Sequence, residues 1–184
     1  TSPLFLLLLL LVPIAVWMNF ALGFVFFALT NAFSTSIFEL YNARGEVLEK
    51  AVAYYHIRSF GHPVVLATFA LTGAFRGIQN LSWSMWISLI GAAVNLVLNP
   101  LLIFGWGSVP AMGIEGSAWA SFVAQLVMFG VAVVVLRTRT PFALFPRTWR
   151  HPELFNLWLL SGNLFARTIA LNACYYLGNR FATG

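Results

Sequence analysis

The sequence has no aspartate, a single cysteine and few charged residues of either sign among its 184 residues. Its charged share is 8%, whereas an ordinary soluble domain carries about 25%. Hydrophobic residues make up 60%, and the mean hydropathy is +0.86. Together these values exclude a cytosolic enzyme and a disordered tail. The lone Cys174 excludes a disulfide scaffold, because it has no internal partner, and is too little for a cysteine-rich metal site.

Long apolar runs fill most of the chain and indicate a polytopic membrane protein. A helix that spans the bilayer needs about 20 mostly apolar residues. The first run continues in a mildly polar form through residues 30–41. We therefore predict an all-α fold, a transmembrane helix bundle with about five spans in this chain. The predicted spans are 4–29, 51–75, 83–106, 111–136 and 154–182.

Both ends of the sequence have the character of cuts within a longer protein. The chain opens at Thr1 without an initiator methionine and closes at Gly184 without a polar tail. The first apolar run lacks the basic start of a signal peptide and is longer than the apolar region of one. We interpret the chain as a fragment.

Basic residues are distributed unequally between the two sets of connections. Connections 76–82 and 137–153 share one side and carry five arginines, whereas 42–50 and 107–110 carry one arginine and one lysine. Because Lys and Arg are retained in the cytoplasm, we predict that 76–82 and 137–153 are cytoplasmic in a multi-pass plasma-membrane protein. The same rule accounts for the arginines mixed with aromatic residues in 137–151, so no nucleic-acid partner is predicted.

Few residues are suited to catalysis or to metal binding. All five glutamates lie in or beside connections. His56 and His62 share a predicted span, but their spacing places them about 120° apart around a helix, so they cannot bind one metal ion from one face. We interpret each as a packed or interfacial histidine. The sequence therefore predicts neither an enzyme nor a metal site.

Two asparagines in the third predicted span form the most informative polar pattern. Asn95 and Asn99 are four residues apart and so share one helix face. Pro100 has no N–H, which leaves the carbonyl of Leu96 without its helical partner. Unpaired amides are costly in hydrocarbon, so these groups must face protein or a water-filled cavity. Two interpretations remain open: hydrogen bonds that join helices, or a cavity and ion site.

An arginine lies deep in the last predicted span. Arg167 follows Trp158 by nine residues, which is about 13 Å along a helix. Asn163 precedes it by one turn on the same face. An arginine near the middle of the bilayer is a functional hypothesis by default, because its burial in lipid is costly. Its partner must be a further helix, an anionic substrate or water.

Residues 73–80 fit the pattern G-x-x-R-G-x-Q-[DN], and residues 95–100 fit the pattern N-x-x-[LF]-[DN]-P. Both patterns are similar to motifs of the multidrug and toxic compound extrusion (MATE) family of transporters, and the chain resembles in particular the DinF-like branch of that family. Residues 113–121, with Gln125 beyond them, resemble the family's G-[IV]-x-G-[AS]-A-x-A-[TS] helix start. Residues 163–168 resemble the opening of the seventh helix. Some members of the family have Asp where this chain has Asn99.

The resemblance implies helices three to seven of a two-lobe, twelve-helix transporter. Residues 1–153 would belong to the N-terminal lobe and 154–184 to the first helix of the C-terminal lobe. The implied activity is antiport, in which organic cations or amphiphiles leave in exchange for H⁺ or Na⁺, with no other cofactor and with a monomer as the working form. The cavity residues would be Asn95, Asn99, Arg167, Asn163, Gln79 and Gln125.

Two other functions stay open at this point. One is a flippase for lipids or lipid-linked oligosaccharides in the same superfamily, in which several cationic residues would line the cavity. The other is a structural membrane subunit that transports nothing. An aspartate inside the first helix of the full gene would favour the antiporter, and a series of Arg and Lys would favour the flippase.

Overall fold

The computed structural model describes residues 3–107 and 109–146, and over these residues its regular structure is α-helical. One isolated β-bridge joins Trp106 and Val109, and there is no β-strand in the described part of the chain. The predicted all-α fold is confirmed there. The helices are α1 Pro3–Ala32, α2 Ser34–Leu40, α3 Glu46–Ser59, α4 His62–Gly77, α5 Leu81–Phe104 and α6 Gly113–Arg139.

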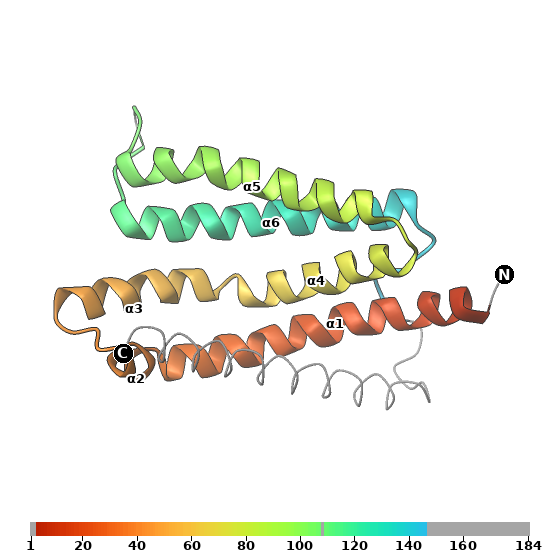
Figure 1. Ribbon diagram of the computed structural model, residues 1–184, viewed down its shortest axis with the longest axis horizontal. Helices are drawn as coiled ribbons and strands as arrows, with labels where there is room; N and C mark the ends of the chain where they lie inside the picture. The colour runs from red at the N-terminus through yellow and green to blue at the C-terminus, as the bar shows by residue number, and fades with distance from the viewer. Residues whose placement is uncertain (1–2, 108, 147–184) are drawn as a thin grey trace, which may run out of the picture. The chain divides into compact units, whose positions relative to one another are not determined.

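The long helices lie side by side in an order that differs from their order in the sequence (Figure 1). α6 packs against α5 on one side and against α3 and α4 on the other, and α1 packs along α4. The short α2 packs against α3 near the end of α1. Short connections make successive long segments antiparallel. α6 therefore lies between α5 and α3, whereas α4 contacts both α5 and α6.

Within the described residues, three helices are long and apolar enough to cross a membrane: Leu9–Ala32, Leu81–Phe104 and Gly113–Arg139. They correspond to the first, third and fourth predicted spans. Large apolar side chains on α5 point away from the bundle, and Leu96 and Val97 are 75% and 66% exposed. Such a surface is a liability in water and is expected in a bilayer. The fifth predicted span lies outside the described residues.

The second predicted span differs from the expected single helix. It begins earlier, at Glu46, and it is divided into α3 and α4 at Phe60 and Gly61. Pro63 lies at the start of α4, where it has no N–H to offer to the carbonyl of Ser59. Neither half alone, at 14 and 16 residues, has the length of a spanning helix. We refer to Phe60 and Gly61 as the junction.

The buried core gathers where α4, α5 and α6 meet α1. Leu71, Phe75, Ile87 and Leu136 are fully buried there, and α1 adds apolar side chains to the same cluster. The chain after α6 also returns to this cluster, since Phe142 is buried in it. Packing is therefore strongest at the end where α4 leads into α5. The polar groups described next lie farther along the helices.

Candidate functional site

A glycine on α6 allows the backbones of α5 and α6 to approach each other very closely. A Cβ at Gly116 would lie 2.3 Å from the carbonyl oxygen of Leu102, so only glycine allows this approach. The backbone N–H of Met112 donates to the same carbonyl at 2.9 Å. Ala120, one turn after Gly116, is also fully buried. Small residues on this face of α6 bring the polar groups of the two helices within hydrogen-bonding distance.

A chain of side-chain hydrogen bonds joins α5 to α6. The Nδ2 of Asn99 donates to the Oδ1 of Asn95 at 2.8 Å. The Nδ2 of Asn95 then donates to the Oγ of Ser121 on α6 at 3.1 Å. The expectation that the two asparagines share a face is confirmed. Ser121, which the sequence did not single out as a site residue, is their partner on the neighbouring helix.

We refer to the linked side chains of Asn99, Asn95 and Ser121 as the amide chain. One hydrogen-bond acceptor in it has no donor among the described residues. The Oδ1 of Asn99 is buried and has no hydrogen-bond partner within the part of the chain that the structure describes. A buried acceptor without a partner costs roughly 1–3 kcal/mol. Amide oxygens are hard ligands that suit an alkali or alkaline-earth cation, and they equally accept an N–H or O–H. The arrangement can therefore take up a cation or a donor group at Asn99, while itself contributing no charge.

The two glutamines from the predicted cavity set lie in different places. Gln79 is exposed in the turn between α4 and α5, with φ +60°, and its N–H donates to the carbonyl of Arg76 at 2.9 Å. That turn is at the opposite end of α5 from Asn99. Gln125 lies one turn after Ser121 on α6, but its Oε1 lies against Gly61 at the junction. The structure thus brings Asn95 and Asn99 together and leaves both glutamines outside their hydrogen-bonded chain.

A second polar region surrounds the junction, and the sequence reading missed it. The Nδ2 of Asn31 donates to the Oγ of Ser59 at 2.8 Å. The Oγ of Ser34 lies 3.2 Å from the Nε2 of His56. Arg58, half-buried one residue before Ser59, forms no ion pair with any described residue. An arginine within an apolar segment and the nearby Gly-x-Pro pattern were the signals that could have found this region.

Asn163 and Arg167 belong to the predicted cavity set as well, and both lie outside the described residues. Their proposed places in the seventh helix therefore remain predictions. Among the residues that are described, no three His, Cys, Asp or Glu side chains gather where they could hold a metal ion.

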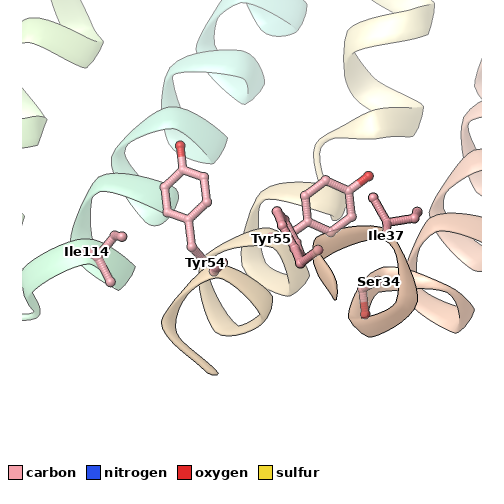
Figure 2. A pocket seen from close by; sticks show the side chains of 7 residues that line it. Ser34, Ile37, Tyr54, Tyr55 and Ile114 are labelled. Atoms are coloured by element: carbon pink, nitrogen blue, oxygen red, sulfur yellow. The ribbon is translucent and has the colours of Figure 1, made fainter. Parts of the chain in front are cut away.

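An apolar cavity of about 470 Å³ opens between α2, α3 and α6. Figure 2 shows its two tyrosines projecting from α3, with Tyr54 on the side of Ile114 and Tyr55 on the side of Ile37. The ring of Tyr55 also lies 6.1 Å from the ring of His62, centre to centre. The cavity therefore adjoins the polar region of the junction through Tyr55.

Comparison with known protein families decides the classification. The family model described as MatE matches residues 10–101, which is half of the chain. The chain belongs to the MatE family. The matched range runs from α1 through most of α5 and so contains the junction, Asn95 and Asn99. Ser121 and Gln125 follow it on α6. No solved structure matches the chain.

Curated relatives of this MatE chain are multidrug resistance and DETOXIFICATION proteins. The probable multidrug resistance protein YoeA of Bacillus subtilis is 29% identical over 133 residues, 72% of this chain and 29% of its own length. Protein DETOXIFICATION 43 of Arabidopsis thaliana is 31% identical over 74% of this chain and 25% of its own length. The probable multidrug resistance protein NorM of Deinococcus radiodurans is 33% identical over 50% of this chain and 20% of its own length. The chain thus spans less than a third of these relatives.

Proposed function

We propose that the complete gene product is a secondary active multidrug efflux antiporter, which exports organic cations or amphiphiles in exchange for Na⁺ or H⁺. Membership of the MatE family and the multidrug resistance relatives support the efflux activity. In this proposal residues 1–153 belong to the N-terminal lobe and 154–184 begin the C-terminal lobe, where Asn163 and Arg167 face the cavity. The plasma membrane is the proposed location.

The observation that carries the ion-coupling part is the unpartnered oxygen of the amide chain. The Oδ1 of Asn99 is buried, and no described residue donates to it, whereas its Nδ2 is already used by Asn95. Asn95 is fixed in turn by Ser121. We infer that α5 and α6 present neutral oxygens to the coupling cation. The compensating negative charge would come from a carboxylate outside the described residues, because amides do not titrate in the physiological range.

The test measures drug efflux from everted vesicles that contain the complete gene product, under separate Na⁺ and pH gradients. For Asn99→Ala we expect the Na⁺ concentration at half-maximal efflux to rise at least about tenfold. The reason is that one hydrogen bond or ligand to a charged group contributes about 1.5–3 kcal/mol. For Asn99→Asp we expect efflux to become dependent on pH over the range in which a buried carboxylate titrates.

Asn19→Ala is the matched control. Asn19 lies within α1, and its side-chain Nδ2 donates to the carbonyl of Ala15 on the same helix at 2.9 Å. Its removal also deletes an amide from a membrane-spanning helix, yet it should leave the Na⁺ and pH dependence unchanged. Rates are normalised to folded protein. If Asn99→Ala and Asn99→Asp retain the ion dependence of the parent protein, the amide chain only joins the helices and has no part in coupling.

A further inference from the structure

The backbone at the junction is tighter than in the helices on either side. The N–H of Phe60 donates to the carbonyl of Ile57 at 3.3 Å, and that of Gly61 to the carbonyl of Arg58 at 3.1 Å. These are bonds to the third preceding residue, as in a 3₁₀ turn, which is a frequent form of hinge inside a helix. With Pro63 just beyond, fewer backbone bonds resist bending at this point than elsewhere in α3 and α4.

Both halves of the divided helix are fixed on their α1 side. The Asn31–Ser59 hydrogen bond holds the end of α3, and the rings of Phe27 and Phe60 lie 5.1 Å apart. At the start of α4, a Cβ on Gly23 would lie 2.3 Å from the Cα of Pro63, so α1 and α4 touch through their backbones. The other neighbour of the junction is α6, which packs against α3 and α4 on the opposite side.

On the α6 side, one polar side chain contacts the junction. A Cβ added to Gly61 would lie 1.8 Å from the Oε1 of Gln125, so this oxygen occupies the place that any larger residue would fill. The same oxygen is buried and receives no hydrogen bond from any described residue. The Oε1 of Gln125 lies against Gly61, but the backbone N–H of Gly61 already donates to the carbonyl of Arg58.

From this geometry we propose that Gln125 is a positioning residue for transport, which selects between two conformations of the junction. In the present conformation the 3₁₀ turn keeps its own hydrogen bonds, and the Oε1 of Gln125 has none. When α3 and α4 bend apart, the turn opens and a junction N–H becomes free to donate to that oxygen. The exchange of one hydrogen bond for the other keeps the two conformations close in free energy.

The position of Gln125 on α6 connects the junction to the amide chain. Ser121, which accepts the hydrogen bond of Asn95, precedes Gln125 by four residues and so lies on the same helix face. A movement of α6 that follows cation binding at Asn99 would therefore move Gln125 against Gly61. This inference rests on the proposed antiport function, but its readout is a distance within the protein.

Spin labels on α3 and α4 test the proposal in the complete gene product. Val47 and Phe69 are 67% and 61% exposed and lie on either side of the junction, so each can be replaced by cysteine in a Cys174→Ser background. Double electron–electron resonance in nanodiscs should show two distance populations whose ratio responds to Na⁺. Gln125→Met, which keeps the chain length but removes the acceptor, should reduce the bent population several-fold. Gln125→Leu should act in the same direction.

A matched pair of glycine variants separates the contact from general helix effects. Gly61→Ala should displace Gln125 and reduce the bent population as Gln125→Met does. Gly73→Ala, within α4 and with no atom within 4 Å of the added Cβ, should leave the distances unchanged. In Gly61→Ala/Gln125→Ala the amide that the new methyl would displace is gone, and the closest remaining atom is the carbonyl oxygen of Arg58 at 3.2 Å. The double variant should therefore lie much closer to Gln125→Ala alone than the sum of the two single changes predicts.

Two outcomes would overturn the proposal. One is a single distance population in the parent protein with and without Na⁺, and the other is an unchanged ratio in Gln125→Met and Gln125→Leu. Absence of drug efflux by the parent protein would instead contradict the proposed function. The vesicle assay measures efflux independently of the spin-label distances. The two failures are thereby told apart.

Discussion

At the scale of single residues, Gly116 determines how closely α6 approaches α5. Its missing side chain allows contact with the backbone carbonyl of Leu102, which cannot move aside as a flexible side chain could. We expect Gly116→Ala to destabilise the folded protein by about 1–3 kcal/mol, the usual cost of overpacking. The fraction that stays monodisperse after heating in detergent, followed by size-exclusion chromatography, measures this effect.

For Gly130, on the same helix, we expect alanine to raise the stability instead of lowering it. A Cβ there meets no atom within 4 Å, so Gly130→Ala gains helix propensity without a clash. That change should stabilise by up to about 1 kcal/mol. If the two alanine variants have equal thermal stability, the contact of Gly116 with Leu102 does not limit the packing of the hairpin.

The pairing within the amide chain shows which part of a site a sequence can reveal. Asn95 and Asn99 are four residues apart on one helix, and their 2.8 Å hydrogen bond follows from local helix geometry alone. Ser121 is 26 residues from Asn95, and its choice as a partner depends on the register of two packed helices. The contact of Gln125 with Gly61 is of the same kind. Long-range register was not predictable from a single sequence, and a role in ion coupling stays a prediction.

At the scale of helices, the spans that follow composition alone were predicted well, and the divided one was not. α1, α5 and α6 are uniformly apolar, so length and hydropathy locate them within a few residues. The segment 51–75 was predicted as one span from its length and its apolar content, although it contains Arg58 and two histidines, and α3 and α4 separate at its Gly-x-Pro pattern. Side chains of α1 and α6 contact the junction between α3 and α4, and a hydropathy average contains no information about such contacts. The pattern around Gly61 carried the information, because proline and glycine interrupt helices.

The chain beyond α6 is attached to α1, which leads to a prediction about this element. The Nε1 of Trp17 donates to the carbonyl of Leu144 at 3.0 Å, and the rings of Trp17 and Phe145 lie 5.4 Å apart. Trp17→Phe keeps an aromatic ring but removes the donor. We expect the fold to lose about 0.5–1.5 kcal/mol and the segment 140–146 to exchange its amide hydrogens faster.

Hydrogen–deuterium exchange with mass spectrometry of the protein in nanodiscs measures that effect. Peptides from the middle of α5, which Trp17 does not touch, serve as the internal reference. Equal protection of 140–146 in the parent protein and in Trp17→Phe would mean that ring packing alone holds the segment against α1.

At the scale of the whole described bundle, the two ends differ in charge. One end carries Arg76 in the last turn of α4 and Arg137 and Arg139 in the last turn of α6, all exposed. The other end carries Arg44 and Lys50 together with four glutamates. Lys50 is neutralised further by an ion pair with Glu46 at 2.6 Å. Since basic residues are retained on the cytoplasmic side, the end with Arg137 and Arg139 is predicted to face the cytoplasm.

Because successive long segments are antiparallel, this orientation predicts on which side of the membrane three positions lie. The connections after α2 and after α5 lie at one end of the bundle, and α6 ends at the other (Figure 1). In a Cys174→Ser background, Arg44→Cys and Trp106→Cys should react with a membrane-impermeant maleimide in intact cells. Thr138→Cys should react only after permeabilisation. All three side chains are exposed, so access to the membrane face alone decides the labelling.

The use of two external positions makes the topology test independent of the charge rule. Arg44 lies beside the charged start of α3, whereas Trp106 lies in a connection, 105–112, without a basic residue. If both are labelled and Thr138→Cys is not, the helices alternate across the membrane as the fold requires, and α3 with α4 crosses it as one divided span. Labelling of Arg44→Cys without Trp106→Cys would mean that α3 and α4 do not cross. Labelling of Thr138→Cys alone would show that the bundle has the opposite orientation in the membrane. The predicted cytoplasmic location of 76–82 and 137–153 would then be wrong.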